Sequence, residues 1–163
     1  MTAPMFRRLL AVVALGLGMI TLGACEPVFP PAPFDSGAGR RIVYSVEQQR
    51  VWLVEADETI ARSYLVSGRA GTPATGVYGV FSKSRYTTAI GGGARMEFMV
   101  RFAQGRSAAI GFHSIPVNSR GAPLQSDAQL GTYQSAGCVR QNWSDAEALW
   151  NWAPVGTQVV VVK

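Results

Sequence analysis

The sequence predicts a single, mainly β domain with one or two short helices. Its 163 residues leave room for one domain and hardly for two. Of these residues, 48% are hydrophobic and 15% are charged, which is typical of a folded core and excludes a disordered chain. Most apolar residues fall in short β-branched or aromatic runs, and these runs predict strands.

About six to nine strands are expected, separated by turn residues. Asp57-Glu58 has the composition of a hairpin turn between two apolar runs. Residues 95–102 partly alternate polar and apolar side chains, as a half-buried strand does. The apolar runs that predict strands are 42–44, 51–54, 59–66, 77–81, 95–102, 108–113 and 157–162.

One segment near the C-terminus has a helical pattern. Ser144 and Glu147 fit an S-x-x-E capping box before the run 148–150. Pro154 and Gly156 follow, and both residue types end helices. We therefore expect a short helix between Ser144 and Pro154.

The N-terminus predicts export from the cytoplasm. Arg7 and Arg8 precede an uncharged apolar run, 9–24, which has the layout of a secretory signal and is short for a membrane-spanning helix. The run ends in Leu22-Gly23-Ala24-Cys25, which resembles the lipobox of bacterial lipoproteins, where the Cys becomes the first mature residue and carries a lipid. The alternative is an ordinary signal peptide whose cleavage site falls near a Cys. The lipobox interpretation predicts a protein of the cell envelope that is anchored to a membrane at Cys25 without spanning it.

The segment after Cys25 predicts a tether. Residues 26–39 contain four prolines followed by Ser36-Gly37-Ala38-Gly39, a composition that favours extended and flexible backbone. Three segments are therefore expected: a signal peptide at 1–24, a lipidated Cys with its tether at 25–39, and one folded domain at 40–163.

The charge balance does not indicate nucleic-acid binding. The net charge is +5, but without Arg7 and Arg8 the count is 13 basic against 10 acidic residues, or +3. An excess this small, spread along the chain, forms no basic patch in the sequence. We expect a monomer with no nucleic-acid partner.

Cys138 and His113 are the candidate reactive pair. If Cys25 carries a lipid, Cys138 is the only thiol left in an exported protein, although a Cys25–Cys138 disulfide is an alternative. With His113 as the only histidine, the chain has too few ligands for a zinc centre, and no metal is expected. An imidazole can hold a thiol as thiolate at neutral pH, which predicts a nucleophilic pair. The alternative is a structural His at a strand end and a Cys that serves as a small buried apolar residue.

The residues around this pair carry a family resemblance. The run Ser135-Ala136-Gly137-Cys138-Val139-Arg140, preceded by a Gly-x-His strand end at 111–113, resembles the motif of the L,D-transpeptidases of bacterial cell walls. The resemblance extends to Thr72-Pro73 with Gly76 and to the run 49–52, and it covers residues 40–163. Ala136 replaces a second His that many members have, Ser114 replaces a frequent Gly, and the loop 115–134 is longer than in compact members.

The resemblance implies a fold, an activity and a set of roles. The fold would be a mixed β-sheet sandwich, and the activity would be cross-linking of peptidoglycan stem peptides through a thioester on Cys138, without a cofactor. His113 would accept the thiol proton, and the backbone carbonyl of Ser114 would orient its ring. Backbone N–H groups of Ala136, Gly137 and Cys138 would stabilise the oxyanion.

Several residues keep two interpretations. Arg140 either binds a carboxylate of the substrate or ties the active-site loop to a neighbouring carbonyl or acidic group. Ser135 either contacts substrate or completes a turn. Tyr133 and Trp143 either line the pocket or belong to the core. The glycines at 91–93 predict a flexible loop beside the site that serves as a lid.

The motif leaves rival functions open. Water as the acyl acceptor would make an L,D-carboxypeptidase, and a protein amine would make an enzyme that attaches proteins to the wall. A cell-wall binding module without turnover is the alternative from another class.

Overall fold

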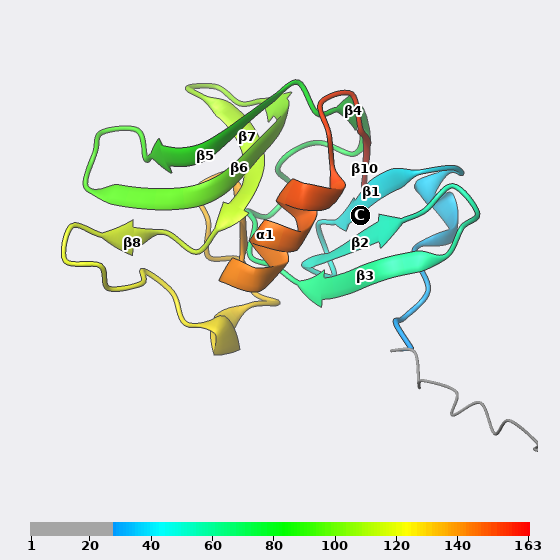
Figure 1. Ribbon diagram of the computed structural model, residues 1–163, viewed down its shortest axis with the longest axis horizontal. Coiled ribbons are helices and arrows are strands. Elements are labelled where there is room, and N and C mark those ends of the chain that lie inside the picture. The colour runs from blue at the N-terminus through cyan, green and yellow to red at the C-terminus, as the bar shows by residue number, and fades with distance from the viewer. Residues whose placement is uncertain (1–27) are drawn as a thin grey trace, which may run out of the picture.

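Residues 28–163, the part of the chain that the computed structural model describes, form two mixed β-sheets that pack against each other, with one α-helix beside them (Figure 1). This arrangement confirms the predicted mainly β fold. The predicted signal peptide and Cys25 lie outside the described residues.

The first sheet holds both ends of the folded chain. Its strand order is β3-β2-β1-β10-β4, and β1 pairs with β10 in parallel while the other neighbours are antiparallel. The parallel pairing brings the last strand beside the first. The five strands are β1 (Arg41–Ser45), β2 (Arg50–Val54), β3 (Ile60–Leu65), β4 (Gly76–Gly79) and β10 (Gln158–Val162).

The second sheet carries the motif of interest. Its order is β5-β6-β7-β9, with the short β8 paired to β6. The strand β9 comes directly after Cys138 and runs parallel to β7, whose fifth residue is His113. The five strands are β5 (Ser82–Thr88), β6 (Ala94–Gln104), β7 (Ala109–Ser114), β8 (Val117–Asn118) and β9 (Val139–Gln141).

The two sheets share one hydrophobic core. Tyr44 of β1 meets Phe112 of β7 edge to face, with ring centroids 6.2 Å apart, and Phe112 stacks on Phe102 of β6. The helix α1 (Trp143–Trp152) adds the fully buried Leu149 to the same core and packs on β6 and β7. Because Phe112 and its neighbours bury one face of the second sheet in this core, a site can form only on the opposite face.

Part of the predicted tether is bound to the folded domain. The indole Nε1 of Trp52 donates a hydrogen bond to the Pro30 carbonyl at 2.9 Å, and Ala32 packs on a second apolar cluster on the outer face of the first sheet. Ser36, in the 3₁₀ turn η1 (Phe34–Ser36), is fully buried. Contacts of the tether with the domain therefore reach back to Pro30, because the first sheet has an apolar outer face that the tether covers.

The strand count and the helix cap also differ from the prediction. The described residues contain ten strands, and β5, β8 and β9 were missed because β5 is polar and the other two are very short. Asn142 caps α1: its side chain accepts hydrogen bonds from the N–H groups of Ser144 and Asp145 at 2.8 and 3.2 Å. The predicted Ser144–Glu147 capping box is therefore wrong, since Ser144 already lies inside the helix.

Candidate active site

The parallel pairing of β7 and β9 brings the motif residues to one face of the second sheet. His113 is opposite Arg140, and Phe112 is opposite Val139. Phe112 and Val139 are fully buried in the core. Because side chains alternate along a strand, His113, Arg140 and Cys138 face away from that core.

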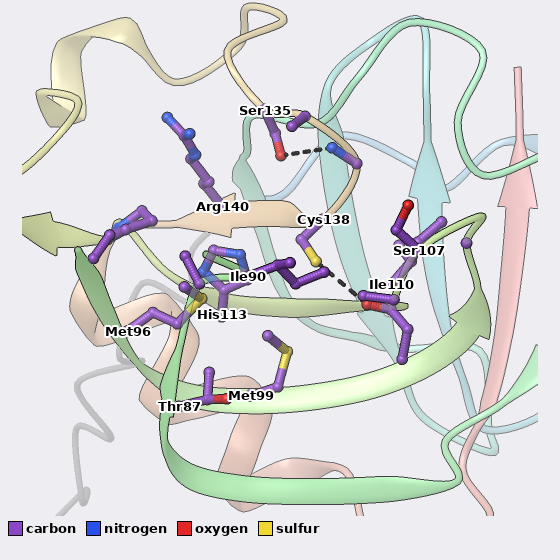
Figure 2. Close-up of a pocket in the computed structure, with 18 of the residues that line it drawn as sticks. Thr87, Ile90, Met96, Met99, Ser107, Ile110, His113, Ser135, Cys138 and Arg140 are labelled. Atoms are coloured by element: carbon purple, nitrogen blue, oxygen red, sulfur yellow. Dashed lines mark hydrogen bonds between the residues drawn. The ribbon is translucent and has the colours of Figure 1, made fainter. Parts of the chain in front are cut away.

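These side chains line one cavity of about 630 Å³. Figure 2 shows Cys138 and His113 on its wall, with Met96 and Met99 of β6 and Thr87 of β5 across from them. A cavity of this size holds a small organic ligand or a few residues of a peptide. The structure thus brings together Cys138 and His113, which are 25 positions apart in the sequence.

Met96 and Met99 both line this cavity although three positions separate them, which a regular strand does not allow. Between them, Phe98 has a left-handed φ of 58° and directs its ring to Trp143 and Trp150 of α1. This backbone irregularity returns Met99 to the cavity side.

His113 is held in one tautomer by the backbone. Its Nδ1 atom is 2.6 Å from the carbonyl oxygen of Ser114, the acceptor that the resemblance implied. A carbonyl only accepts, so Nδ1 carries the proton and Nε2 keeps a free lone pair. The ring is 3% exposed, and this burial lowers the pKa of His113 to about 4, with the charge of Arg140 acting in the same direction. The imidazole is therefore neutral at pH 7.

Cys138 is half-buried, and its thiol donates to the carbonyl oxygen of Ala109 at 3.7 Å (Figure 2). Burial raises the pKa of Cys138, against the opposing effects of the Gly111 N–H group and of Arg101 and Arg140. The expectation of a thiolate held by the imidazole at neutral pH is therefore wrong for this structure. Burial disfavours charge on both groups, so a neutral thiol lies in the same cavity as a neutral imidazole.

The turn before Cys138 is held by Ser135. Its hydroxyl accepts a hydrogen bond from the N–H group of Gly137 at 3.1 Å, and its own N–H donates to the Gly68 carbonyl at 3.1 Å. Arg69 donates to the carbonyl of Ala136 at 3.3 Å. Ser135 thus completes a turn, and the Gly137 N–H, one of the expected oxyanion donors, already has an acceptor.

Arg140 is positioned by residues that the sequence did not indicate. Its Nη1 donates to Oε1 of Gln125 at 3.3 Å, and Nε2 of Gln125 donates to the Ser67 hydroxyl at 2.7 Å. Gln125 is 4% exposed, and Ser67 exchanges two backbone hydrogen bonds with Arg140. Both residues lie in polar loop segments without a motif, so no local signal could have found them.

The cavity is basic. Four arginines line it, and none of its lining residues is Asp or Glu; the four are Arg69, Arg101, Arg106 and Arg140. The ion pairs among residues 28–163 do not include any of these four. Their charge is therefore available to an anionic ligand.

Two predicted neighbours of the site lie elsewhere. Tyr133 and Trp143 do not line this cavity, and each is about half exposed (48% and 50%), so neither is a core residue. Trp143 lines a separate pocket of about 390 Å³ instead. The loop with glycines 91–93 does lie beside the site, because Ile90, 71% exposed, lines the main cavity.

Within residues 28–163, no helix has the length and apolarity needed to cross a membrane. The same residues hold no group of three His, Cys, Asp or Glu side chains close enough to bind a metal ion.

Comparison with known proteins identifies the class to which this fold and site belong. The family model of the L,D-transpeptidase catalytic domain, YkuD, matches residues 39–161. The chain therefore belongs to the L,D-transpeptidase catalytic domain family, which confirms the resemblance.

Solved structures of the same fold include several L,D-transpeptidases. LdtMt1 in complex with imipenem matches 77% of this chain with a TM-score of 0.61 and 22% identity. An L,D-transpeptidase from Mycobacterium smegmatis matches 78% of this chain with a TM-score of 0.61 and 20% identity. An L,D-transpeptidase from Mycobacterium tuberculosis H37Rv matches 78% of this chain with a TM-score of 0.59 and 24% identity. The present chain spans 60%, 60% and 59% of those three chains, respectively. No curated protein sequence matches this chain significantly.

Proposed function

We propose that this chain is a peptidoglycan L,D-transpeptidase that cross-links stem peptides through a thioester on Cys138. The observation that carries the proposal is the placement of Cys138 and His113 in one basic cavity of a domain from this family. A neutral imidazole with a free Nε2 is a competent general base for a neutral thiol.

The first half-reaction acylates the cysteine. Nε2 of His113 takes the proton of Sγ while the sulfur attacks the carbonyl carbon of an L,D peptide bond in the donor stem. The C–S bond forms, the C–N bond to the terminal D-residue breaks, and the imidazolium gives its proton to the leaving amine. In the second half-reaction an amine of another stem attacks the thioester and loses its proton to His113. The C–S bond then breaks, and the imidazolium of His113 returns the proton to Sγ of Cys138.

The oxyanion of each tetrahedral intermediate needs fixed donors. We place it near the backbone N–H groups of Ala136, Gly137 and Cys138. Because the Gly137 N–H donates to Ser135 Oγ, the oxyanion would replace that hydroxyl as the acceptor. Ser135 would then be free to hydrogen-bond the substrate.

The substrate of such a reaction is anionic, which agrees with the four arginines of the cavity. Peptidoglycan stems carry carboxylates, and the planar fork of Arg140 suits one of them. Gln125 holds this guanidinium through a neutral amide and leaves its positive charge intact.

We further propose that the enzyme is a monomeric lipoprotein, exported and anchored at Cys25, with its domain facing the cell wall. The basis is the lipobox-like sequence 22–25, and the family's wall substrate calls for an extracytoplasmic site. Mass spectrometry of the protein from producing cells that finds no lipid on Cys25 would contradict the anchor.

The direct test is mass spectrometry of tetrapeptide-stem muropeptides incubated with the full chain in mild detergent. The matched control is Cys138→Ala. Cross-linked dimer that forms only with the intact cysteine supports the transpeptidase. Cys-dependent release of tripeptide alone identifies an L,D-carboxypeptidase, and a stem joined to an added protein amine identifies an attachment enzyme. Retained binding without Cys-dependent turnover identifies a wall-binding module.

A further inference from the structure

The backbone of residues 135–138, called here the cysteine turn, is fastened to the first sheet on both sides of the nucleophile. Before the nucleophile, the N–H group of Ser135 donates to the Gly68 carbonyl at 3.1 Å. After it, Arg140 and Ser67 exchange two backbone hydrogen bonds, at 2.8 and 2.9 Å. The position of the cysteine turn therefore depends on two adjacent residues, Ser67 and Gly68, which directly follow the strand β3.

One buried residue, Gln49, holds this pair from the connection between β1 and β2. Its backbone carbonyl accepts from the N–H group of Val66 at 2.8 Å, and its side-chain Oε1 accepts from the N–H group of Gly68 at 2.5 Å. Gln49 thus grips the chain on both sides of Ser67. Because Gln49 is only 1% exposed, it does not contact a substrate, and it can act on the reaction only through the segment 66–68.

The Gln49 side chain is itself fixed. Nε2 donates to the Val46 carbonyl at 2.6 Å and to the Tyr44 hydroxyl at 3.0 Å, which uses both of its N–H groups and leaves Oε1 for Gly68. The backbone φ of Gln49 is 47°, a left-handed conformation that is unfavourable for most residues other than glycine. Buried residues held in such a conformation by their surroundings are typical of functional sites.

Gly68 passes this restraint on to the cysteine turn. A Cβ at Gly68 would lie 2.0 Å from the Tyr44 hydroxyl oxygen, so the position excludes a side chain that could fix the backbone by packing. Since glycine has the widest backbone freedom, the bond from its N–H group to Gln49 restricts the direction of its carbonyl. That carbonyl holds Ser135, whose hydroxyl accepts from the N–H group of Gly137 beside Cys138 (Figure 2).

We propose that Gln49 is a positioning residue that fixes Gly68 and thereby holds the backbone N–H groups of the cysteine turn in the geometry that the oxyanion needs. The inference deepens the proposed function and rests on it, because the oxyanion is placed at this turn. Preorganised donors lower the barrier to acyl transfer, and a misplacement of about 1 Å can cost a factor of about 100 in rate. The role therefore predicts slower acylation of Cys138, but unchanged reactions of the thiol that form no oxyanion.

The test compares two reactions of Cys138 in the full chain, with Cys138→Ala as the background. With p-nitrophenyl acetate, Sγ attacks the carbonyl carbon through an oxyanion. The C–S bond forms, the C–O bond breaks, p-nitrophenolate leaves, and the thiol proton passes through His113 to the solvent. With iodoacetamide, Sγ displaces iodide from a saturated carbon without an oxyanion. For Gln49→Met, which keeps the side-chain length without its polar atoms, we expect acylation to slow about tenfold or more and alkylation to stay within about twofold.

Tyr44→Phe is the matched control. It removes one hydrogen bond of Gln49 Nε2 but leaves the bonds to the Val46 carbonyl and to Gly68, so both reactions should stay within about twofold of the wild type. Equal slowing of acylation in Tyr44→Phe and Gln49→Met, or equal slowing of both reactions in Gln49→Met, would show a merely structural Gln49 and would overturn the inference. Should Gln49→Met fail to fold, Gln49→Asn replaces it with the same expectation, because Asn tolerates a left-handed backbone but its amide is one methylene shorter.

The outcome is independent of the transpeptidase assay. Acylation that slows selectively in Gln49→Met, while the wild type does not cross-link muropeptides, supports the role of Gln49 and contradicts the proposed reaction. Cross-linking and acylation that are both unchanged in Gln49→Met support the reaction and overturn this role.

Discussion

His113 and Ser114 are adjacent in sequence, and the carbonyl oxygen of Ser114 lies 2.6 Å from Nδ1 of the His113 ring. The orienting acceptor of the candidate base is therefore part of the backbone, and no side-chain substitution deletes it directly. The Ser114 hydroxyl has a different task, since it accepts a hydrogen bond from the N–H group of Glu97 at 3.0 Å.

The burial of His113 predicts a pH-dependent stability. The pKa of this group is about 4 in the folded protein and about 6.5 when unfolded, so between these values the unfolded chain binds the extra proton. The contribution of neutral His113 is fully present above pH 6.5 and is lost as the pH falls through 4. A shift of this size corresponds to roughly 3 kcal/mol in the free energy of unfolding.

The measurement is urea unfolding of wild type and His113→Gln at pH 7 and pH 4.5. Carboxylates titrate in both proteins between these pH values. The difference between the two proteins in the loss of unfolding free energy therefore reports on His113 alone. We expect the wild type to lose more stability on acidification than the variant. Equal losses would show that His113 is not buried as a neutral ring.

Gln125 offers a way to change the charge of the Arg140 guanidinium without touching Arg140. Gln125→Glu would place a carboxylate 3.3 Å from Nη1, and the ion pair would compete with an anionic substrate. We expect KM for the donor stem to rise several-fold, while kcat changes less. Gln125→Ala removes two buried hydrogen bonds and should cost about 1–3 kcal/mol of stability without neutralising Arg140. An unchanged KM in Gln125→Glu would show that Arg140 does not bind the substrate.

The N-terminal segment predicts a stability effect of its own. Trp52→Phe keeps most of the apolar packing but loses the hydrogen bond from Nε1 to the Pro30 carbonyl, so Tm should fall by about 2–8 °C. A chain that begins at Arg40 also loses Ala32 and the buried Ser36, and its Tm should fall further. Thermal unfolding followed by circular dichroism checks both. Equal Tm values for the wild type and the chain from Arg40 would mean that the segment contributes nothing.

The helix cap can be tested by two neighbouring substitutions. Asn142→Ala removes the acceptor of two helix N–H groups and should lower the free energy of unfolding by about 1 kcal/mol. Ser144→Ala, at the residue that the sequence pattern favoured, should cost much less, because its hydroxyl only contacts Asn142. Urea titrations of both variants compare them directly. A larger loss of stability in Ser144→Ala than in Asn142→Ala would support the predicted Ser144–Glu147 capping box instead.

The sequence indicated the parts of the site that are contiguous or rare. Cys138, Arg140 and Ser135 lie within six positions, and His113 is the only histidine, so the pair could be named before the fold was known. Gln125 and Ser67 could not, because their relation to Arg140 depends on which strands and loops become neighbours. The strand β5 was missed for a related reason: its sequence SKSRYTT has no apolar alternation, and it is stabilised by pairing with β6.

The basic cavity predicts a preference among alkylating agents. Iodoacetate carries a carboxylate and iodoacetamide is neutral, while their reaction with a thiolate is otherwise alike. With four arginines and no acidic side chain around Cys138, we expect the ratio of the iodoacetate rate to the iodoacetamide rate to exceed that of a free cysteine peptide. Added salt should lower the ratio, because counterions screen the arginines. Arg106→Gln, in the exposed turn between β6 and β7, should lower it as well, whereas Arg120→Gln outside the cavity should not. A ratio that equals the peptide value at low salt would show that these arginines do not act on ligands that approach the cysteine.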